Sequence, residues 1–299
     1  MRIKWWLIFT SVLGANLASG QVKRQFNVED TPACESVKLY VKANSGNCYI
    51  KPSQNTDILN VFSNQDAESF SHNFYKEVKG KICEVRLDLE QVKAEGFSHT
   101  LSTRVFGASE KTNSDKYWKM YLTDNKPYRL ELTYGVGNAN VDLSGLSVKK
   151  LQISTGSADV NIGYNTLENR IDMDSFLVKV DLGSVKVRKM NLSRAHFVMA
   201  DVGFGNMTLD FSGEPLVTNL VKGSVGAGNL VIILPDTNVP VLVKVRDSWL
   251  CSVSMPKNLQ KIAENTFANQ AYQAKSVQTP LTFDLDVSMG HIIFKEAHQ

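Results

Sequence analysis

Residues 178–187 read Val-Lys-Val-Asp-Leu-Gly-Ser-Val-Lys-Val, and this run decides the fold. Apolar residues stand three and five positions before Gly183, and again two and four positions after it. Alternation of this kind is typical of a β-strand with one buried face, but its phase changes across the glycine. We therefore expect the chain to turn a corner at Gly183. We also expect that glycine to adopt a positive φ, because it has no Cβ.

The same pattern recurs along the chain, and each copy predicts a structural corner. The predicted corners are Gly46, Gly137, Gly156, Gly183, Gly205, Gly228 and Gly290. The five from Gly137 to Gly228 are 19, 27, 22 and 23 residues apart, and a period near 20 residues indicates stacked units that share one core. The sequence predicts an all-β protein, a single-stranded, β-solenoid-like ladder of short strands with glycine corners. Residues 230–234 are continuously apolar, which predicts one strand covered on both faces.

The ends of the chain carry weaker signals. Residues 63–80 are polar and are expected to form a loop, and residues 258–278 a helical or hairpin excursion. We expect a signal peptide (1–20), an N-terminal β-region (21–108), a loop and connecting strand (109–127), and a β-repeat domain (128–299). The alternative is a single ladder in which 128–299 continues from 21–108.

The first 20 residues predict export. Arg2 and Lys4 precede a short apolar stretch, which ends in the small residues Ala18-Ser19-Gly20. These features are typical of a cleaved secretory signal. No later run is apolar for long enough to span a bilayer. The formal net charge of +3 gives no argument for nucleic acid or an anionic membrane as partner. The expected location is the periplasm, the extracellular space or the cell surface.

Four cysteines leave several pairings open. In an exported protein, Cys34 could bridge to Cys83 or to Cys48, or the thiols could be free and buried. The candidate disulfide that we favour joins Cys34 and Cys83. Cys251 is expected to be unpaired.

No catalytic, cofactor-binding or metal-binding residue is predicted. The Gly-x-Gly pairs lack the third glycine and the following helix of a dinucleotide site. The remaining candidates are isolated, and we interpret them as surface residues. The histidines are His72, His99, His196, His291 and His298; the aspartates near corners are Asp142, Asp159, Asp181, Asp201 and Asp210; the outward tyrosines are Tyr49, Tyr117, Tyr121 and Tyr164.

Four stretches carry a family resemblance. They are YGVGNANVDLSGL, VDLGSVKV, ADVGFGNMTLDFSG and GSVGAGNLVIILPDTNVPVLVKV, within residues 128–250. They resemble the bacterial toast-rack and adhesin-type β-repeat domains, and the C-terminal region of LiaF-like envelope-stress proteins. The resemblance implies a toast-rack ladder without a known catalytic signature. The chain departs from the LiaF-like proteins in one respect: they carry membrane helices ahead of this domain, and this chain has a predicted cleaved signal instead.

Three functions follow from these features. The first is an exported, non-enzymatic β-repeat protein of the cell envelope, adhesin-like or a binding scaffold, whose partner is an envelope protein or a glycan. The second, by analogy with the family, is a regulatory sensor of envelope stress. The third is a polysaccharide-active β-solenoid enzyme, which would need carboxylates that converge on one outer face.

Overall fold

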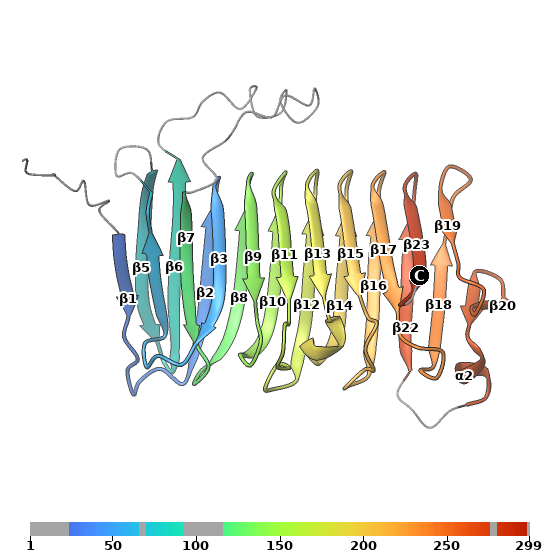
Figure 1. The fold of residues 1–299 in the computed structure, drawn as a ribbon, viewed down its shortest axis with the longest axis horizontal. Helices are drawn as coiled ribbons and strands as arrows, with labels where there is room; N and C mark the ends of the chain where they lie inside the picture. Colours follow the sequence, from blue (N-terminus) through green and yellow to red (C-terminus); the bar gives the residue numbers. More distant parts are fainter. Residues whose placement is uncertain (1–23, 66–69, 92–115, 276–279, 298–299) are drawn as a thin grey trace, which may run out of the picture.

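The computed structural model describes residues 24–65, 70–91, 116–275 and 280–297. These residues form two β-sheets of 11 and 12 strands that face each other across one hydrophobic core. The expectation of an all-β, toast-rack-type ladder is confirmed. Figure 1 shows the strands side by side along the long axis of the molecule.

Each sheet runs the length of the ladder, and most neighbouring strands are parallel. In spatial order, sheet A contains β1 (Arg24–Val28), β4 (Leu59–Ser63), β7 (Tyr117–Thr123), β3 (Asn47–Ser53), β9 (Asn138–Asp142), β11 (Asp159–Gly163), β13 (Ser184–Arg188), β15 (Asn206–Asp210), β17 (Asn229–Leu234), β23 (His291–Glu296) and β19 (Ser252–Ser254). Sheet B contains β20 (Gln260–Ala263), β21 (Thr266–Ala268), β18 (Val241–Arg246), β22 (Leu281–Val287), β16 (Asn219–Val225), β14 (Ala195–Val202), β12 (Met173–Val180), β10 (Ser147–Thr155), β8 (Pro127–Tyr134), β2 (Ser36–Ala43), β6 (Ile82–Gln91) and β5 (Phe70–Lys79).

The chain alternates between the sheets in coils of two strands. A strand of sheet B reaches a tight corner and continues as a strand of sheet A, as β12 does into β13. The corners lie along the upper edge in Figure 1, and the longer connections, including the 3-10 helix η1 (Met190–Ser193), lie along the lower edge. The coil β22–β23 lies between β16–β17 and β18–β19, although it follows both in sequence.

The two ends of the ladder close differently. At one end β1 and β5 pair antiparallel to their neighbours, and Phe26 stacks on His72 with ring centroids 5.2 Å apart. At the other end β20 and β21 form an antiparallel hairpin, followed by the short helix α2 (Gln270–Gln273). The hairpin and the helical turn expected in residues 258–278 are therefore both present. No helix within the described ranges is long and apolar enough to cross a bilayer.

The corners were explained incorrectly from the sequence. Among the seven predicted corner glycines, only Gly46 and Gly137 have a positive φ, of 98° and 102°. Close contact between coils explains Gly183: a Cβ there would lie less than 3.0 Å from the carbonyl oxygen of Ala158 in the preceding coil. Gly205, Gly228 and Gly290 would each meet the glycine carbonyl of the neighbouring corner in the same way. The stacking of backbones, more than the turn itself, requires glycine there.

Gly156 lies in the corner between β10 and β11, but the register predicted for it is wrong by two residues. Asp159 pairs with both Asn138 and Ser184, so the residue before it, Ala158, occupies the position of Gly137 and Gly183. The error arises because inward positions recur every second residue, and a shift of two leaves the pattern unchanged.

Two further expectations are wrong. Val231 and Ile233 of β17 are half-buried, so the outer face of this strand is not covered. Residues 70–79, expected within a loop, form β5, which pairs along its whole length with β6. Its alternation is obscured because the strand lies at the edge of the sheet and exposes Phe74 and Val78.

Candidate functional site

An open groove of about 270 Å³ lies on the outer face of sheet A, over β9, β11 and β13. Two transverse rows of side chains line it, because the parallel strands are in register. One row runs from Tyr49 through Asn140 and Asn161 to Lys186. The second, one step nearer the corners, contains Asn138, Asp159 and Ser184.

Long side chains form the two ends of the groove. Tyr49 on β3 and Lys186 on β13 are three strand spacings apart, about 14 Å across the sheet. The ring of Tyr49 packs edge-on against Tyr117, with centroids 6.4 Å apart, and the Lys119 ammonium lies 4.1 Å from the centre of the Tyr117 ring. These contacts brace the Tyr49 ring. Lys186 is exposed and has no ion-pair partner among the described residues.

Short polar side chains form the floor between them. Ser184 donates a hydrogen bond to Asp159 across the coils (Oγ to Oδ1, 2.8 Å), and Asn138 donates one to Asn47 (Nδ2 to Oδ1, 3.1 Å). The side-chain oxygen of Asn161 is covered and has no hydrogen-bond partner in the described part of the chain. Because this oxygen is covered, a ligand in the groove would contact the exposed polar atoms of the floor instead.

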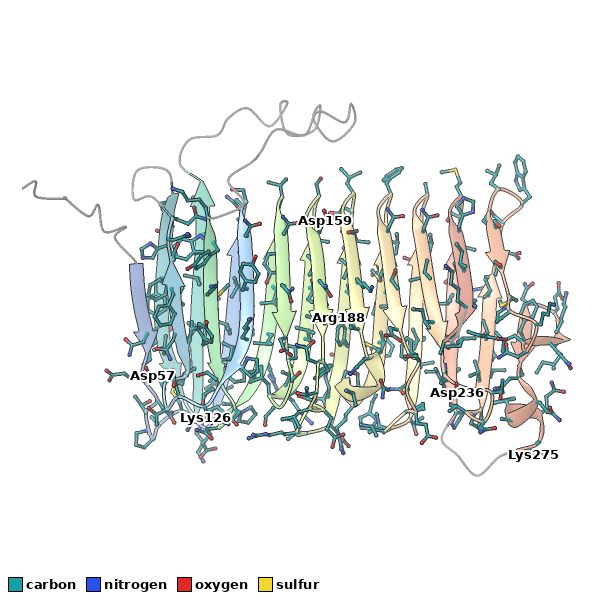
Figure 2. All side chains as sticks on the ribbon, in the orientation of Figure 1. Asp57, Lys126, Asp159, Arg188, Asp236 and Lys275 are labelled. Carbon is teal, nitrogen blue, oxygen red and sulfur yellow. A yellow bond between two sulfur atoms is a disulfide. The ribbon has the colours of Figure 1, made fainter. Side chains whose placement is uncertain are left out.

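The aspartates near the corners do not form a common site. The side chains of Asp142 and Asp210 each accept a backbone N–H two residues later, from Ser144 and Ser212, at 3.0 Å. These bonds begin the turns that leave the two strands. Of the others, Asp201 accepts a hydrogen bond from Ser224, and Asp181 pairs with Lys179. Figure 2 shows Asp159 near the corner edge of the ladder.

The histidines are also separated. His72 lies on β5 in the aromatic cluster, His196 on β14 beside Asp172, and His291 on β23 at a corner. His99 and His298 lie outside the described residues. No group of three or more metal-ligating side chains occurs in the part of the chain that the structure describes. The backbone N–H groups of the Gly-x-Gly corners bond to the neighbouring coil, as Gly205 does to the Asp181 carbonyl at 3.0 Å, which leaves few of them for a phosphate.

The four tyrosines expected to face outward divide unequally. Tyr49, Tyr117 and Tyr121 lie on the outer face of sheet A, on β3 and β7. Tyr164 is buried, which contradicts the expectation, because it follows the strand β11 and turns back into the core. Its hydroxyl has no partner among the described residues, and burial raises the pKa of this phenol above its usual range.

The cysteines lie in three environments. The structure joins Cys34, which precedes β2, and Cys83 on β6 in a disulfide, with Cα atoms 5.4 Å apart. Cys48 is a free, buried thiol on the inner face of β3, and burial raises its pKa to about 12. Cys251 is free and partly exposed, and it precedes β19 at the position that Gly290 occupies in the neighbouring coil.

Sequence analysis missed the groove, although its elements were visible. From the sequence, Tyr49 is predicted to face outward and Asp159 to lie near a corner. What brings them together is the register between coils of different length. The two-residue error at Gly156 would have displaced Asn161 from the row.

The two continuous sheets and the row of stacked corners define a β-solenoid-like repeat protein with a polar groove on one face. Residues 18–187, more than half of the chain, match the family model described as the N-terminal domain of toast_rack, DUF2154. The chain belongs to this family, so the resemblance seen in the sequence is confirmed. The match begins well before residue 128 and ends at Val187, before η1.

Solved structures with a similar arrangement carry no functional argument, because their TM-scores are below 0.5. A candidate cell adhesion protein from Clostridium sporogenes has a TM-score of 0.45 at 16% identity, over 92% of this chain and 98% of that one. A candidate adhesin from Bacteroides fragilis has 0.33 at 13%, over 91% and 96%. A candidate lipid-binding protein from Parabacteroides distasonis has 0.31 at 10%, over 91% and 95%. A search of curated proteins finds no match.

Proposed function

We propose that the protein is an exported, non-enzymatic β-repeat protein of the cell envelope that binds a glycan chain, in the manner of an adhesin. The observation that carries the proposal is the groove between Tyr49 and Lys186. Export rests on the signal-like residues 1–20, which lie outside the described residues.

The chemistry of the groove suits a sugar chain. A tyrosine ring offers an apolar face with a polar tip, and the apolar face of a pyranose can pack on it. Amides, a hydroxyl and a carboxylate on the floor offer both donors and acceptors to sugar hydroxyls. The groove is open, and its length of about 14 Å between the two ends accommodates a few sugar rings.

The same groove is poorly equipped for hydrolysis. Glycoside hydrolysis by the usual mechanism needs two carboxyl groups on either side of the scissile bond. Asp159 is the single carboxylate among the described residues that line the groove. Its neighbour across the coil is Ser184, which holds one carboxylate oxygen in a hydrogen bond. This arrangement favours binding without turnover.

The proposal is tested on a glycan microarray, followed by titration of the best-bound oligosaccharide. Tyr49→Ala should weaken binding by about tenfold, because an aromatic contact contributes on the order of 1 kcal/mol beyond its buried area. Tyr121→Ala is the matched control: Tyr121 lies on the same outer face but packs on Phe62, outside the groove. Equal binding by the two variants, or binding to no array glycan, would contradict the proposal.

A further inference from the structure

A row of large apolar side chains projects from the corner edge of the ladder. We define the tip ridge as Leu182, Phe204, Met289, Trp249 and Leu250, whose exposed fractions are 58%, 72%, 56%, 90% and 50%. They lie at the tips of successive corners, from β12–β13 to β18–β19, and Figure 2 shows side chains that project along this edge. Contiguous exposure of this kind on a soluble surface marks an interaction site.

The row is straight because backbone hydrogen bonds stack the tips. Leu182 N–H donates to the Gly156 carbonyl (2.8 Å), Phe204 N–H to the Asp181 carbonyl (2.7 Å), and Met289 N–H to the Gly226 carbonyl (2.8 Å). The corner of Ala227 falls between Phe204 and Met289 and contributes a smaller apolar group. From β13 to β19 the ridge spans four strand spacings, about 19 Å.

The shape of the ridge favours a fluid partner. It is convex and about one residue wide, whereas a stable protein interface needs on the order of 800 Å² from each partner. A bilayer interface can close around single projecting side chains. Tryptophan is enriched at that depth, because its ring is apolar and its N–H is polar.

The charges beside the ridge exclude an anionic lipid surface. On the side of sheet B, the nearest charged groups include two cations, Lys179 and Arg246, and four carboxylates, Asp181, Asp201, Asp247 and Asp286. Both cations are paired, Lys179 with Asp181 at 3.3 Å and Arg246 with Asp286 at 2.5 Å. On the side of sheet A, the adjoining row is mostly uncharged: Asn138, Asp159, Ser184, Asn206, Asn229, His291 and Ser252.

From this surface we infer that the protein docks edge-on to a zwitterionic phospholipid bilayer, with the tip ridge inserted into the interface. In this orientation the sheets stand out of the membrane, and the groove between Tyr49 and Lys186 stays accessible. The inference does not depend on the proposed glycan binding.

Trp249 is a built-in probe for this docking. The full chain with Trp5 and Trp6 replaced by phenylalanine keeps two tryptophans, the buried Trp118 and the exposed Trp249. Vesicles of phosphatidylcholine should shift the Trp249 emission to shorter wavelength, and phosphatidylcholine brominated in its acyl chains should quench it. Added phosphatidylglycerol should not strengthen binding, because carboxylates flank the ridge.

Single substitutions locate the contact. Phe204→Ser and Leu182→Ser should each weaken vesicle binding, measured by the Trp249 shift, by about tenfold, since each removes an apolar side chain from the interface. Leu167→Ser is the matched control, because Leu167 is 60% exposed but lies in the loop that follows β11, away from the corners. Far-ultraviolet circular dichroism checks that each variant is folded.

Three results would overturn the inference. One is a Trp249 emission that vesicles neither shift nor quench. This result would overturn the inference even if the protein bound the vesicles, because another part of the chain would then make the contact. Another is equal binding by Phe204→Ser and Leu167→Ser. The third is binding that requires phosphatidylglycerol, which would indicate an electrostatic contact instead of apolar insertion.

Discussion

Replacement of Gly183 by alanine tests the stacking of the corners. A Cβ at this position would lie less than 3.0 Å from the carbonyl oxygen of Ala158, so the two coils must move apart locally. That oxygen also accepts the Ser184 N–H at 3.1 Å, and Gly183 N–H donates to the Gly156 carbonyl at 2.9 Å. The substitution therefore strains the bonds that hold β13 against β11.

The magnitude follows from opposing terms. Overpacking costs about 1–3 kcal/mol, and two misaligned hydrogen bonds cost about 1 kcal/mol each. Alanine also restricts the unfolded chain, which returns about 0.4–1 kcal/mol. We expect Gly183→Ala to lower the free energy of unfolding by about 2–5 kcal/mol.

Urea unfolding followed by far-ultraviolet circular dichroism measures this difference. Gly156→Ala is the matched control, because its φ is not positive and the nearest atom to an added Cβ is the Gly135 carbonyl oxygen, at 3.2 Å. We expect this control to stay within about 1 kcal/mol of the parent protein. At the corner between β10 and β11, Ala158 occupies the position that Gly183 occupies in the next coil, so a Cβ is accommodated there. The close-contact explanation is therefore tested at Gly183, where the carbonyl of Ala158 blocks a Cβ. If Gly183→Ala were no less stable than Gly156→Ala, the close-contact explanation would be refuted.

Two further predictions concern the cysteines. The Cys34–Cys83 disulfide closes a separation of 49 residues, and the lost loop-closure entropy of the unfolded chain stabilises the folded state by about 4 kcal/mol. Dithiothreitol should therefore lower the urea midpoint of the parent protein but not that of Cys34→Ser. An equal loss in both proteins would contradict this prediction. Burial raises the pKa of Cys48 from 9.0 to about 12. Between these pH values the Cys48 thiol keeps its proton in the folded state and loses it in the unfolded state. The free energy of unfolding should therefore decline as pH rises from 9 towards 12. The parent protein and Cys48→Ala, compared by thermal unfolding across that range, should differ in slope, and parallel curves would show that Cys48 is not the cause.

The sequence predicts the ladder well because the inward residues report it directly. Val178, Val180, Val185 and Val187 are all buried, and the change of phase at Gly183 is a real passage from sheet B to sheet A. Alternation cannot, however, distinguish registers that differ by two residues, and this explains the error at Gly156. It also cannot report the distance between backbones, which is what most of the corners require. The division into four segments stays a prediction.

The candidate site is less visible in the sequence, because it depends on neighbours in space. Tyr49 and Lys186 are far apart along the chain, and only the pairing of β3, β9, β11 and β13 brings them to one groove. The tip ridge is similar: Leu182 and Phe204 precede their glycines as ordinary corner residues. Met289 joins their row because the coil β22–β23 lies between β16–β17 and β18–β19.

The structure of the protein with a bound oligosaccharide would test the central claim most directly. The account predicts a sugar ring packed on the face of Tyr49, and a sugar hydroxyl within hydrogen-bond distance of the Lys186 ammonium, which is exposed and has no ion-pair partner among the described residues. An oligosaccharide bound elsewhere on the ladder, with the groove between Tyr49 and Lys186 empty, would contradict it.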